Sequence, residues 1–249
     1  MHEEFVGARV LVTGGSKGIG KAIALAFAQA GAKVGMLART EADLKAAAAE
    51  IKQRTNADPL ILVGDVSDYE RMKSCFALFE KTYGGLDVLV NSAGINNPQG
   101  TLATELSEWE EVIRVNLTGT FICCKLAAEI MSRQMRGNII NISSVQARNG
   151  GRSPQYSASK AGVEGITKSL SREMAKYHVR VNSLAPAGTE TDFAKYWNAE
   201  TRAALEKNSL MGRIAQPKEI ASCALFLASE AASYITGSTL NVSGGTLLN

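Results

Sequence analysis

Short apolar runs alternate with longer helical patterns along almost all of this chain of 249 residues. The apolar runs, rich in Val, Ile and Leu, predict seven strands, at residues 8–14, 33–37, 60–65, 86–94, 138–144, 179–186 and 238–245. Most lack a polar residue at every second position, which is typical of strands covered on both faces. Helical crossovers between successive strands predict parallel pairing. We therefore expect an α/β fold of the Rossmann type: a doubly wound parallel sheet of about seven strands with helices on both faces.

Composition excludes several classes of protein. No linker or change in composition divides residues 1–249, so we expect one domain. The net charge is only +3 and no run of like charge occurs, which argues against nucleic acid or membrane as the main partner. The apolar runs are too short to span a bilayer, and the first residues do not resemble a signal peptide. The four cysteines lack CxxC spacing and only two histidines occur. We therefore expect no metal site, and reduced thiols in a cytoplasmic protein.

A glycine-rich stretch, residues 11–20, follows the first predicted strand and precedes an alanine-rich helix. Gly14, Gly18 and Gly20 have GxxxGxG spacing, which differs from the GxGxxG of the general dinucleotide fingerprint. Glycines here permit a tight turn and a close backbone approach, and the first amides of the helix then face the opening. The stretch suits a pyrophosphate, but on its own an ordinary strand–helix turn explains it equally well.

Five motifs occur in a fixed order, namely TGGSKGIG at 13–20, NSAG at 91–94, VNLTGTF at 115–121, ISSV at 142–145 and YSASK at 156–160. Together they resemble the classical short-chain dehydrogenase/reductase family, over essentially the whole chain from Val10 to Gly245. The resemblance implies an oxidoreductase that interconverts a ketone and a secondary alcohol by hydride transfer with NAD(P). It also implies a homotetramer whose interfaces include helices near residues 109–133 and 156–177.

Tyr156 and Lys160 are four residues apart in a predicted helix, so their side chains share one face. An ammonium beside a phenol lowers the phenol pKa and makes tyrosine a usable proton donor near neutral pH. From spacing alone, an exposed surface pair is the commoner outcome. The resemblance implies that Tyr156 is the general acid in carbonyl reduction and the general base in the reverse direction. Lys160 would tune Tyr156 and bind the nicotinamide ribose, and Asn116 would interrupt a helix and hold a water for proton relay.

The resemblance also implies a serine, just after the fifth strand, that polarises the substrate carbonyl. Ser144 occupies the motif position directly before Val145 and lies 12 residues before Tyr156. Many members have one residue more in this interval, which would select Ser143. We assign the role to Ser144, with Ser143 as the alternative.

The end of the second predicted strand bears on the choice of cofactor. An NAD-preferring site has an acidic residue there to accept hydrogen bonds from the ribose hydroxyls, but this strand leads into Arg39. Glu41 and Asp43 come later and fit the first turn of the next helix. Arg39 can bind a phosphate with its guanidinium, and Lys17 can add a point charge. These two cations predict NADP(H), with NAD(H) as the alternative; ordinary solvated side chains are the non-functional interpretation.

Further cofactor contacts follow from the resemblance. Ile19 would line the nicotinamide pocket, and Asp65 with Val66 would receive the adenine ring. The full set of expected cofactor-binding residues is Gly14, Ser16, Lys17, Gly18, Ile19, Gly20, Arg39, Asp65, Val66, Asn91, Ala93, Gly94, Tyr156, Lys160, Thr189 and Thr191.

Residues 187–209 contain no clear strand, and we expect them to form a substrate-covering segment. The chain has PAGTET at 186–191 where the family commonly has PGxxxT, so Ala187 narrows the space near the nicotinamide. Phe193, Tyr196 and Trp197 form an aromatic cluster beside the expected active site. The alternative is a surface helix whose aromatic side chains pack on the core or on a neighbouring subunit.

The motifs define a reaction but no single substrate. Chain length and MGRIAQPKEIA at 211–221 resemble the family's 3-oxoacyl-carrier-protein reductases, so a 3-oxoacyl thioester, carried on acyl carrier protein, is the favoured substrate. Sugar, polyol or xenobiotic alcohols are the alternative. An acidic carrier protein needs a basic patch, for which the candidates are Arg133, Arg136, Arg148 and Arg152. A silent cofactor-binding regulator, an epimerase or dehydratase, and an enoyl reductase fit less well; enoyl reductases space Tyr and Lys more widely.

Overall fold

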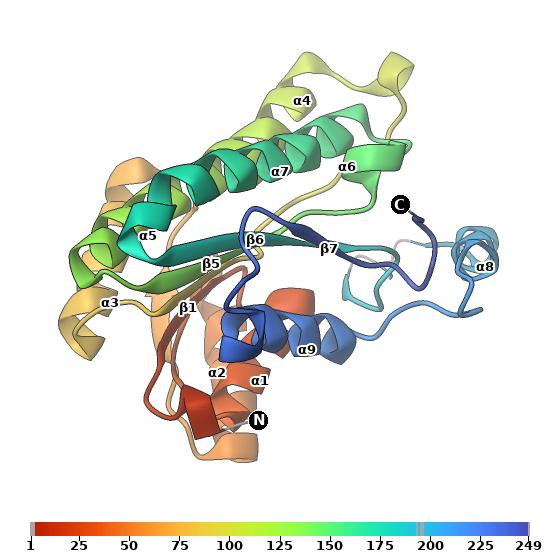
Figure 1. The fold of residues 1–249 in the computed structure, drawn as a ribbon. Coiled ribbons are helices and arrows are strands. Elements are labelled where there is room, and N and C mark those ends of the chain that lie inside the picture. Colours follow the sequence, from red (N-terminus) through yellow and green to blue (C-terminus); the bar gives the residue numbers. More distant parts are fainter. Residues whose placement is uncertain (1–2, 193, 195–196, 249) are drawn as a thin grey trace.

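The computed structural model describes residues 3–192, 194 and 197–248. Seven strands form one parallel sheet in the order β3-β2-β1-β4-β5-β6-β7 (Figure 1). Their bounds are β1 Arg9–Thr13, β2 Lys33–Ala38, β3 Leu60–Val63, β4 Val88–Asn91, β5 Gly137–Ile142, β6 Val179–Pro186 and β7 Thr239–Val242. The seven predicted strands and the doubly wound parallel sheet are therefore confirmed. The single domain over residues 1–249 stays our interpretation.

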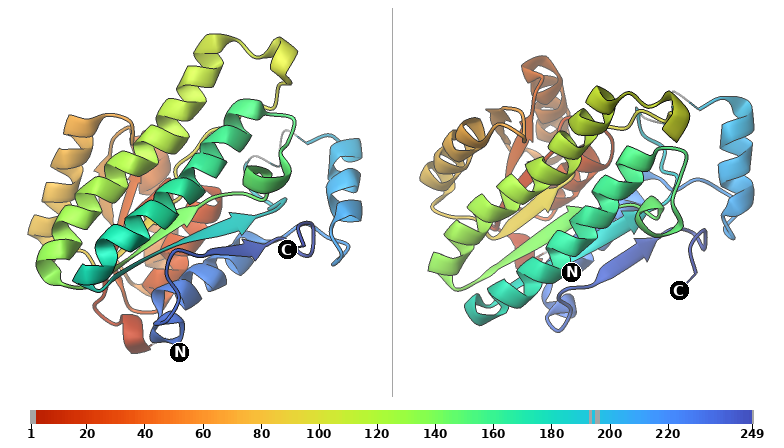
Figure 2. Two further views of the ribbon diagram at one scale, coloured as in Figure 1. Left: turned by 45° about the horizontal axis from the view of Figure 1, so that its top comes forward. Right: turned by 90° about the horizontal axis from the view of Figure 1, so that it is seen from above.

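Helices cover both faces of this sheet (Figures 1 and 2). One face carries α1 Gly18–Gln29, α2 Glu41–Thr55 and α9 Pro217–Ala228. The other carries α3 Tyr69–Tyr83, α5 Gly119–Gln134 and α7 Pro154–Met174, with α4 Leu106–Ile113 joined to α5 by the π-helix η3 Arg114–Thr118. Two short helices, α6 Gln146–Asn149 and α8 Ala199–Asn208, lie beyond the carboxyl ends of the strands. Single 3-10 turns occupy η1 Glu3–Phe5, η2 Thr101–Ala103, η4 Ala175–Tyr177 and η6 Glu230–Ala232.

Two clusters of buried apolar side chains lie on opposite faces of the sheet, and successive residues of one strand enter different clusters. In β1, Val10 and Val12 pack beneath α1, α2 and α9, whereas Leu11 packs beneath α3 and α5. Both faces of the strand therefore require apolar residues. This two-sided burial is the physical reason for the continuous apolar runs in the sequence.

The strand order changes direction between β1 and β4, because β1 continues to β2 and β3 on one side while β4 to β7 extend to the other. Thr13 and Asn91 are register partners at the carboxyl ends of these two strands. In open α/β sheets, ligands bind in the crevice outside the carboxyl ends of the strands at such a point. Within the described part of the chain, no helix has both the length and the apolar character needed to cross a bilayer.

Candidate active site

The glycine-rich turn between β1 and α1 packs tightly against its surroundings. Gly14 has a φ of +65°, and a β-carbon there would lie 2.8 Å from the Ala93 backbone. A β-carbon on Gly20 would overlap the Gly14 carbonyl oxygen. Gly18 faces a third segment, since its β-carbon position is 3.2 Å from Thr191. The turn thus brings the segments after β1, β4 and β6 together at one place.

The NSAG motif ends β4 and continues beside this turn. The Thr13 hydroxyl accepts hydrogen bonds from the Ser92 and Ala93 amides at 3.1 and 3.2 Å, which ties the motif to the end of β1. Asn91 is buried, and its amide nitrogen donates to the Asn141 oxygen at 2.9 Å and to the Cys124 sulfur at 3.2 Å. The side chain of Asn91 therefore points into the protein interior, so only its backbone is left for the predicted cofactor contact.

Asn116 lies in the π-helix η3, so the predicted interruption of a helix is present. Its side chain is fully buried, accepts from the Ile95 amide at 2.8 Å and donates to the Ile95 carbonyl at 2.9 Å. The amide nitrogen also donates to the Ser159 hydroxyl on α7 at 3.2 Å. Asn116 thus holds the loop after β4 against α7. Single π-helical turns inside α-helices are frequent at functional sites.

Ser143 and Ser144 follow β5 directly and face different partners. The Ser143 hydroxyl is buried and donates to the Lys160 carbonyl at 3.2 Å and to the Glu164 carboxylate at 3.1 Å. The Ser144 hydroxyl accepts from the Gln146 amide at 3.2 Å, and its interaction with the Tyr156 phenol acts to lower the pKa of Tyr156. Of the two candidate serines, Ser144 is thus the one that acts on the pKa of Tyr156.

Tyr156 and Lys160 lie on α7, which begins at Pro154 as expected from proline's preference for the first helical turn. The Lys160 ammonium is 5.6 Å from the centre of the Tyr156 ring and donates to the Ile142 carbonyl at 2.7 Å. Burial lowers the pKa of Lys160 to about 8. Burial also raises the pKa of Tyr156 above its ordinary value, against the opposing hydrogen bond from Ser144. The expected lowering of the tyrosine pKa by Lys160 is therefore wrong for the protein alone: burial dominates the pKa of Tyr156, and Lys160 is not among the groups that shift it.

The predicted adenine side of the site lies at the ends of β2 and β3. Arg39 is exposed there, whereas the Lys17 ammonium forms an ion pair with Asp43 at 2.7 Å. Asp65 accepts from the Ser67 amide and hydroxyl at 2.9 and 2.6 Å. Burial acts against ionisation of Asp65, but the Ser67 bonds and the charges of Arg114 and Arg39 hold its pKa below the ordinary value.

Two residues of this region were missed by the sequence analysis. Arg114 lies 3.6 Å from the Asp65 carboxylate and also contacts the Ser67 hydroxyl. The available signal was the position of Arg114 directly before the VNLTGTF motif, two residues ahead of Asn116. Nothing in the local sequence relates Ser67 to that arginine.

The remaining predicted cofactor residues differ in how much surface they offer. Val66 is 6% exposed and packs against Gly119, so its side chain mainly fills the core beneath α5. Ser16 and Ile19, in the glycine-rich turn, are half-buried. Thr189 is buried and donates to the Ala187 carbonyl at 3.0 Å, within a bridge to Ala215.

The predicted substrate-covering segment contains a helix, α8, at Ala199–Asn208. None of the residues of α8 is buried, and the helix stands apart from the sheet (Figure 2). Arg202 holds it to the chain after β6 through an ion pair with Glu190 at 2.8 Å. Trp197 is half-buried, while Phe193 and Tyr196 lie outside the described residues. A cover over the substrate therefore stays a prediction.

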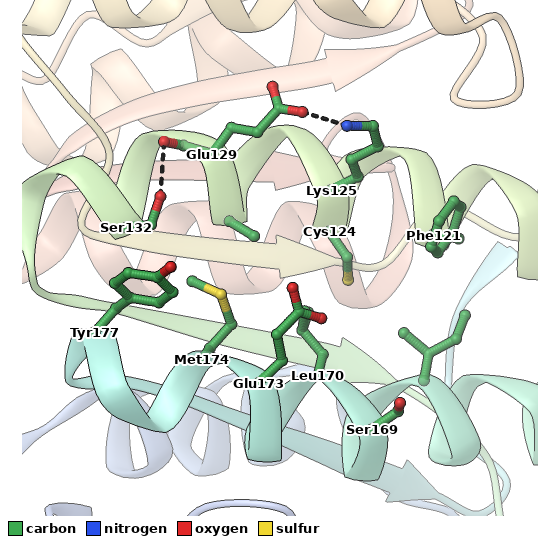
Figure 3. Close-up of a pocket in the computed structure, with 12 residues that line it drawn as sticks. Phe121, Cys124, Lys125, Glu129, Ser132, Ser169, Leu170, Glu173, Met174 and Tyr177 are labelled. Carbon is green, nitrogen blue, oxygen red and sulfur yellow. Dashed lines mark hydrogen bonds and ion pairs between the residues drawn. The ribbon is translucent and has the colours of Figure 1, made fainter.

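A groove of about 380 Å³ lies between α5 and α7, away from these residues (Figure 3). Phe121, Leu170 and Tyr177 contribute apolar walls, and Lys125 and Glu129 form an ion pair at its edge. None of the predicted catalytic or cofactor-binding residues lines this groove. Among the described residues, no cluster of His, Cys, Asp and Glu could hold a metal ion.

Comparison with known proteins identifies relatives of the whole chain. The family model described as "Enoyl-(Acyl carrier protein) reductase" matches residues 14–246. The 3-oxoacyl-[acyl-carrier-protein] reductase FabG of Aquifex aeolicus is 39% identical over 236 residues, 94% of this chain and 95% of that protein. The 3beta-hydroxysteroid dehydrogenase 1 of Eggerthella lenta is 37% identical, covering 100% and 97%. A short-chain type dehydrogenase/reductase from Mycobacterium marinum superposes with a TM-score of 0.93 at 34% identity, covering 98% and 97%.

Proposed function

The chain belongs to the short-chain dehydrogenase/reductase family, and we propose that it is an NADP(H)-dependent reductase that converts a ketone into a secondary alcohol. One observation carries the proposal: Tyr156 and Lys160 lie one turn apart on α7, with the ammonium 5.6 Å from the centre of the Tyr156 ring, and Ser144 acts on the pKa of the same tyrosine. A proton donor, a polarising hydroxyl and a cation are thereby gathered at the carboxyl end of the sheet. This is the set of groups that carbonyl reduction requires.

The residues of the chain have distinct roles in this mechanism. Bound reduced nicotinamide supplies the hydride that the carbonyl carbon accepts. Tyr156 gives its proton to the carbonyl oxygen, and Ser144 stabilises the alkoxide as it develops. The phenol of Tyr156 is protonated near neutral pH and so has a proton to give, although its raised pKa makes it a weaker acid in the protein alone. Asn116 holds the loop that follows β4 against α7, close to the reacting groups. Its proposed role is to hold a water molecule for proton relay.

The residues at the glycine-rich turn fit a dinucleotide. Side chains larger than hydrogen at Gly14 and Gly20 would collide with the protein backbone, so the turn keeps the close approach that a pyrophosphate needs. The start of α1 has no side-chain cap among the described residues, and its first amide groups are suited to bind an anion. These features support the turn as the pyrophosphate site.

The preference for NADP(H) over NAD(H) rests on the end of β2. Arg39 is exposed there and near enough to Asp65 to influence its pKa, so it stands at the adenosine side of the site. A 2′-phosphate placed there would meet the Arg39 guanidinium, and Lys17, which pairs with Asp43 in the first turn of α2, would add a second cation. Asp43 already pairs with Lys17, so we assign most of the preference to Arg39.

The favoured substrate is a 3-oxoacyl thioester, because several relatives are named 3-oxoacyl-[acyl-carrier-protein] reductase. Three of the four arginines proposed to bind an acidic carrier protein have carboxylate partners within the folded chain. Arg133, Arg136 and Arg148 bond to Glu80, Asp87 and Glu164, respectively. Arg152 is exposed, and the described residues show no ion pair to it. We therefore take Arg152 as the candidate for contact with an acidic carrier.

We propose a homotetramer and a cytoplasmic location as parts of the same function. The groove between α5 and α7 supports the first, since both helices were predicted to form interfaces and Phe121 at the groove is 52% exposed. An exposed aromatic beside an apolar groove is typical of a contact between subunits. The location is supported by four free cysteines, which are usual in a reducing compartment.

The test of this function is the rate of NADPH oxidation by the purified protein on a 3-oxoacyl thioester, beside a panel of diketones, keto-sugars and ketosteroids. Turnover of the thioester that is lost in Tyr156→Phe, while NADPH binding remains, is the expected result. Activity only on the panel would move the substrate to another carbonyl class. NADPH binding without turnover on any carbonyl would favour the cofactor-binding regulator. Reduction of an enoyl thioester would favour the reaction named in the family model's description.

A further inference from the structure

We propose that Glu164 is a positioning residue, which acts with Arg148 to hold the segment after β5 so that Ser144 stays aligned with Tyr156. The inference rests on the proposed roles of Ser144 and Tyr156 in carbonyl reduction. Glu164 and Arg148 touch neither the reacting groups nor the expected cofactor site, and they would act through the serine.

The Glu164 side chain is 7% exposed and its carboxylate has two partners from the same segment. One oxygen accepts from the Ser143 hydroxyl at 3.1 Å, and the other accepts from the Arg148 guanidinium at 3.2 Å. A buried carboxylate is costly, and apolar residues of similar volume often replace a buried ion pair without loss of stability. Stability alone therefore does not account for this pair, whereas a requirement for one fixed geometry does.

The two partners of Glu164 flank Ser144 in the sequence, so the carboxylate holds the chain on both sides of it. Arg148 belongs to α6, and the amide of Gln146 in the same helix donates to the Ser144 hydroxyl at 3.2 Å. The orientation of that hydroxyl consequently depends on where α6 lies. Arg148 fixes α6 through Glu164 on α7 and through the Asn241 oxygen on β7 at 3.2 Å.

Three residues on successive turns of α7 each interact with the same segment. Lys160 donates to the Ile142 carbonyl, Glu164 accepts from Ser143 and Arg148, and Tyr156 is influenced by Ser144. Their spacing of four residues places all three on one face of the helix. The proposed catalytic pair and the Glu164 contact thus form one continuous line between α7 and residues 142–148.

The first test is kinetic, with Glu164→Gln, Arg148→Met and the double variant. We expect kcat about tenfold lower in each single variant with KM for NADPH within about twofold, because small misplacements of a catalytic group cost rate more than binding. The double variant is expected to be no slower than the slower single variant, since both remove one contact. Glu80→Gln serves as the control, because Glu80 pairs with Arg133 at 2.8 Å between α3 and α5, far from α7's first turns.

The second test needs no turnover. It measures the pKa of the Tyr156 phenol by spectrophotometric titration. The signal of Tyr156 is obtained by subtracting, for each protein, the titration curve of the same protein with the additional substitution Tyr156→Phe. The Ser144 hydrogen bond lowers the pKa of Tyr156, so a loosened Ser144 is expected to raise that pKa towards the value in Ser144→Ala. In Glu164→Gln, loss of a nearby anion without movement of Ser144 would instead lower the pKa, so the sign separates the two explanations in that variant. Loss of the Arg148 cation would itself raise the pKa, so Arg148→Met is judged by its kinetics.

The proposal is overturned if Glu164→Gln and Arg148→Met unfold at lower temperature but keep wild-type kcat and the wild-type tyrosine titration. It is also overturned if the single effects on kcat multiply in the double variant. If the wild-type protein reduces no carbonyl, the proposed function fails, and the titration still decides whether Glu164 positions Ser144.

Discussion

The Lys160 ammonium lies 5.6 Å from the centre of the Tyr156 ring, yet its hydrogen bond goes to the Ile142 carbonyl, 2.7 Å away. In the protein alone, burial therefore dominates both groups: it raises the pKa of Tyr156 and lowers that of Lys160 to about 8. Near neutral pH the phenol keeps its proton and the lysine keeps its charge. The site in this state therefore holds a proton that it can donate, as the proposed carbonyl reduction requires.

The lowered pKa of Lys160 predicts a pH-dependent contribution to stability. The folded-state pKa is about 8 and the ordinary value is 10.5, so between these values the unfolded chain holds a proton that the folded chain has lost. Stability from this group therefore rises with pH across that window. Relative to Lys160→Met, the unfolding free energy of the wild type is expected to gain up to about 3 kcal/mol from pH 8 to 10.5. Urea unfolding of both proteins at several pH values measures this difference, and a flat difference would contradict it.

Arg39→Asp is expected to change the cofactor preference from NADPH towards NADH. The aspartate would repel a 2′-phosphate and accept hydrogen bonds from the ribose hydroxyls that NADH carries. We expect KM for NADPH to rise by about 100-fold, the loss of a bidentate charge-assisted contact, while KM for NADH falls. The control is Arg54→Asp at the far end of α2, where the arginine pairs with Glu50 on its own helix. Unchanged preference in Arg39→Asp would exclude Arg39 from the phosphate site.

Gly20→Ala is expected to damage both stability and cofactor binding. The added methyl group would overlap the Gly14 carbonyl oxygen, so α1 would have to move away from the end of β1. A loss of about 2 kcal/mol or more in unfolding free energy is expected, with weaker NADPH binding. Gly100→Ala is the matched control, because a β-carbon at Gly100 meets nothing within 4 Å and its φ is −76°. Thermal unfolding and NADPH fluorescence titration measure both effects, and equal behaviour of the two variants would contradict the explanation.

Phe121→Lys is expected to reduce the mass of the assembly without unfolding the chain. Phe121 is 52% exposed beside the α5–α7 groove, so a charge there costs little within one copy but is unfavourable between two apolar surfaces. Analytical ultracentrifugation of wild type and variant gives the masses, and circular dichroism checks the fold. A wild-type monomer would overturn the proposed homotetramer, whereas an unchanged tetramer in Phe121→Lys would place its interfaces elsewhere.

The strands were predictable because burial on both faces leaves a strong local signal, and the prediction for β6 at 179–186 agrees with the structure at both ends. The arrangement of the site was harder to predict from the sequence than the strands were. Ser143 and Ser144 have the same chemistry, and only the folded chain shows which one meets Tyr156. The rise in the Tyr156 pKa comes from burial by distant segments, and the Glu164–Arg148 contact joins residues 16 apart without any pairing motif. Local patterns predict elements, whereas these properties arise from tertiary packing.

The two adjacent serines give the sharpest test of the assignment at the active site. Ser144→Ala removes the hydroxyl that acts on Tyr156, and we expect kcat to fall by about 100- to 1000-fold, as when one donor to a developing oxyanion is lost. Ser143→Ala removes a donor to Glu164 and to the Lys160 carbonyl, so it is expected to act mainly on stability, by about 1 kcal/mol, with a much smaller fall in kcat. The two variants differ by one position and remove the same atom, so each controls for the other. Steady-state kinetics with urea unfolding separate the effects. If Ser143→Ala loses the greater part of kcat and Ser144→Ala does not, the roles are reversed and Ser143 polarises the carbonyl.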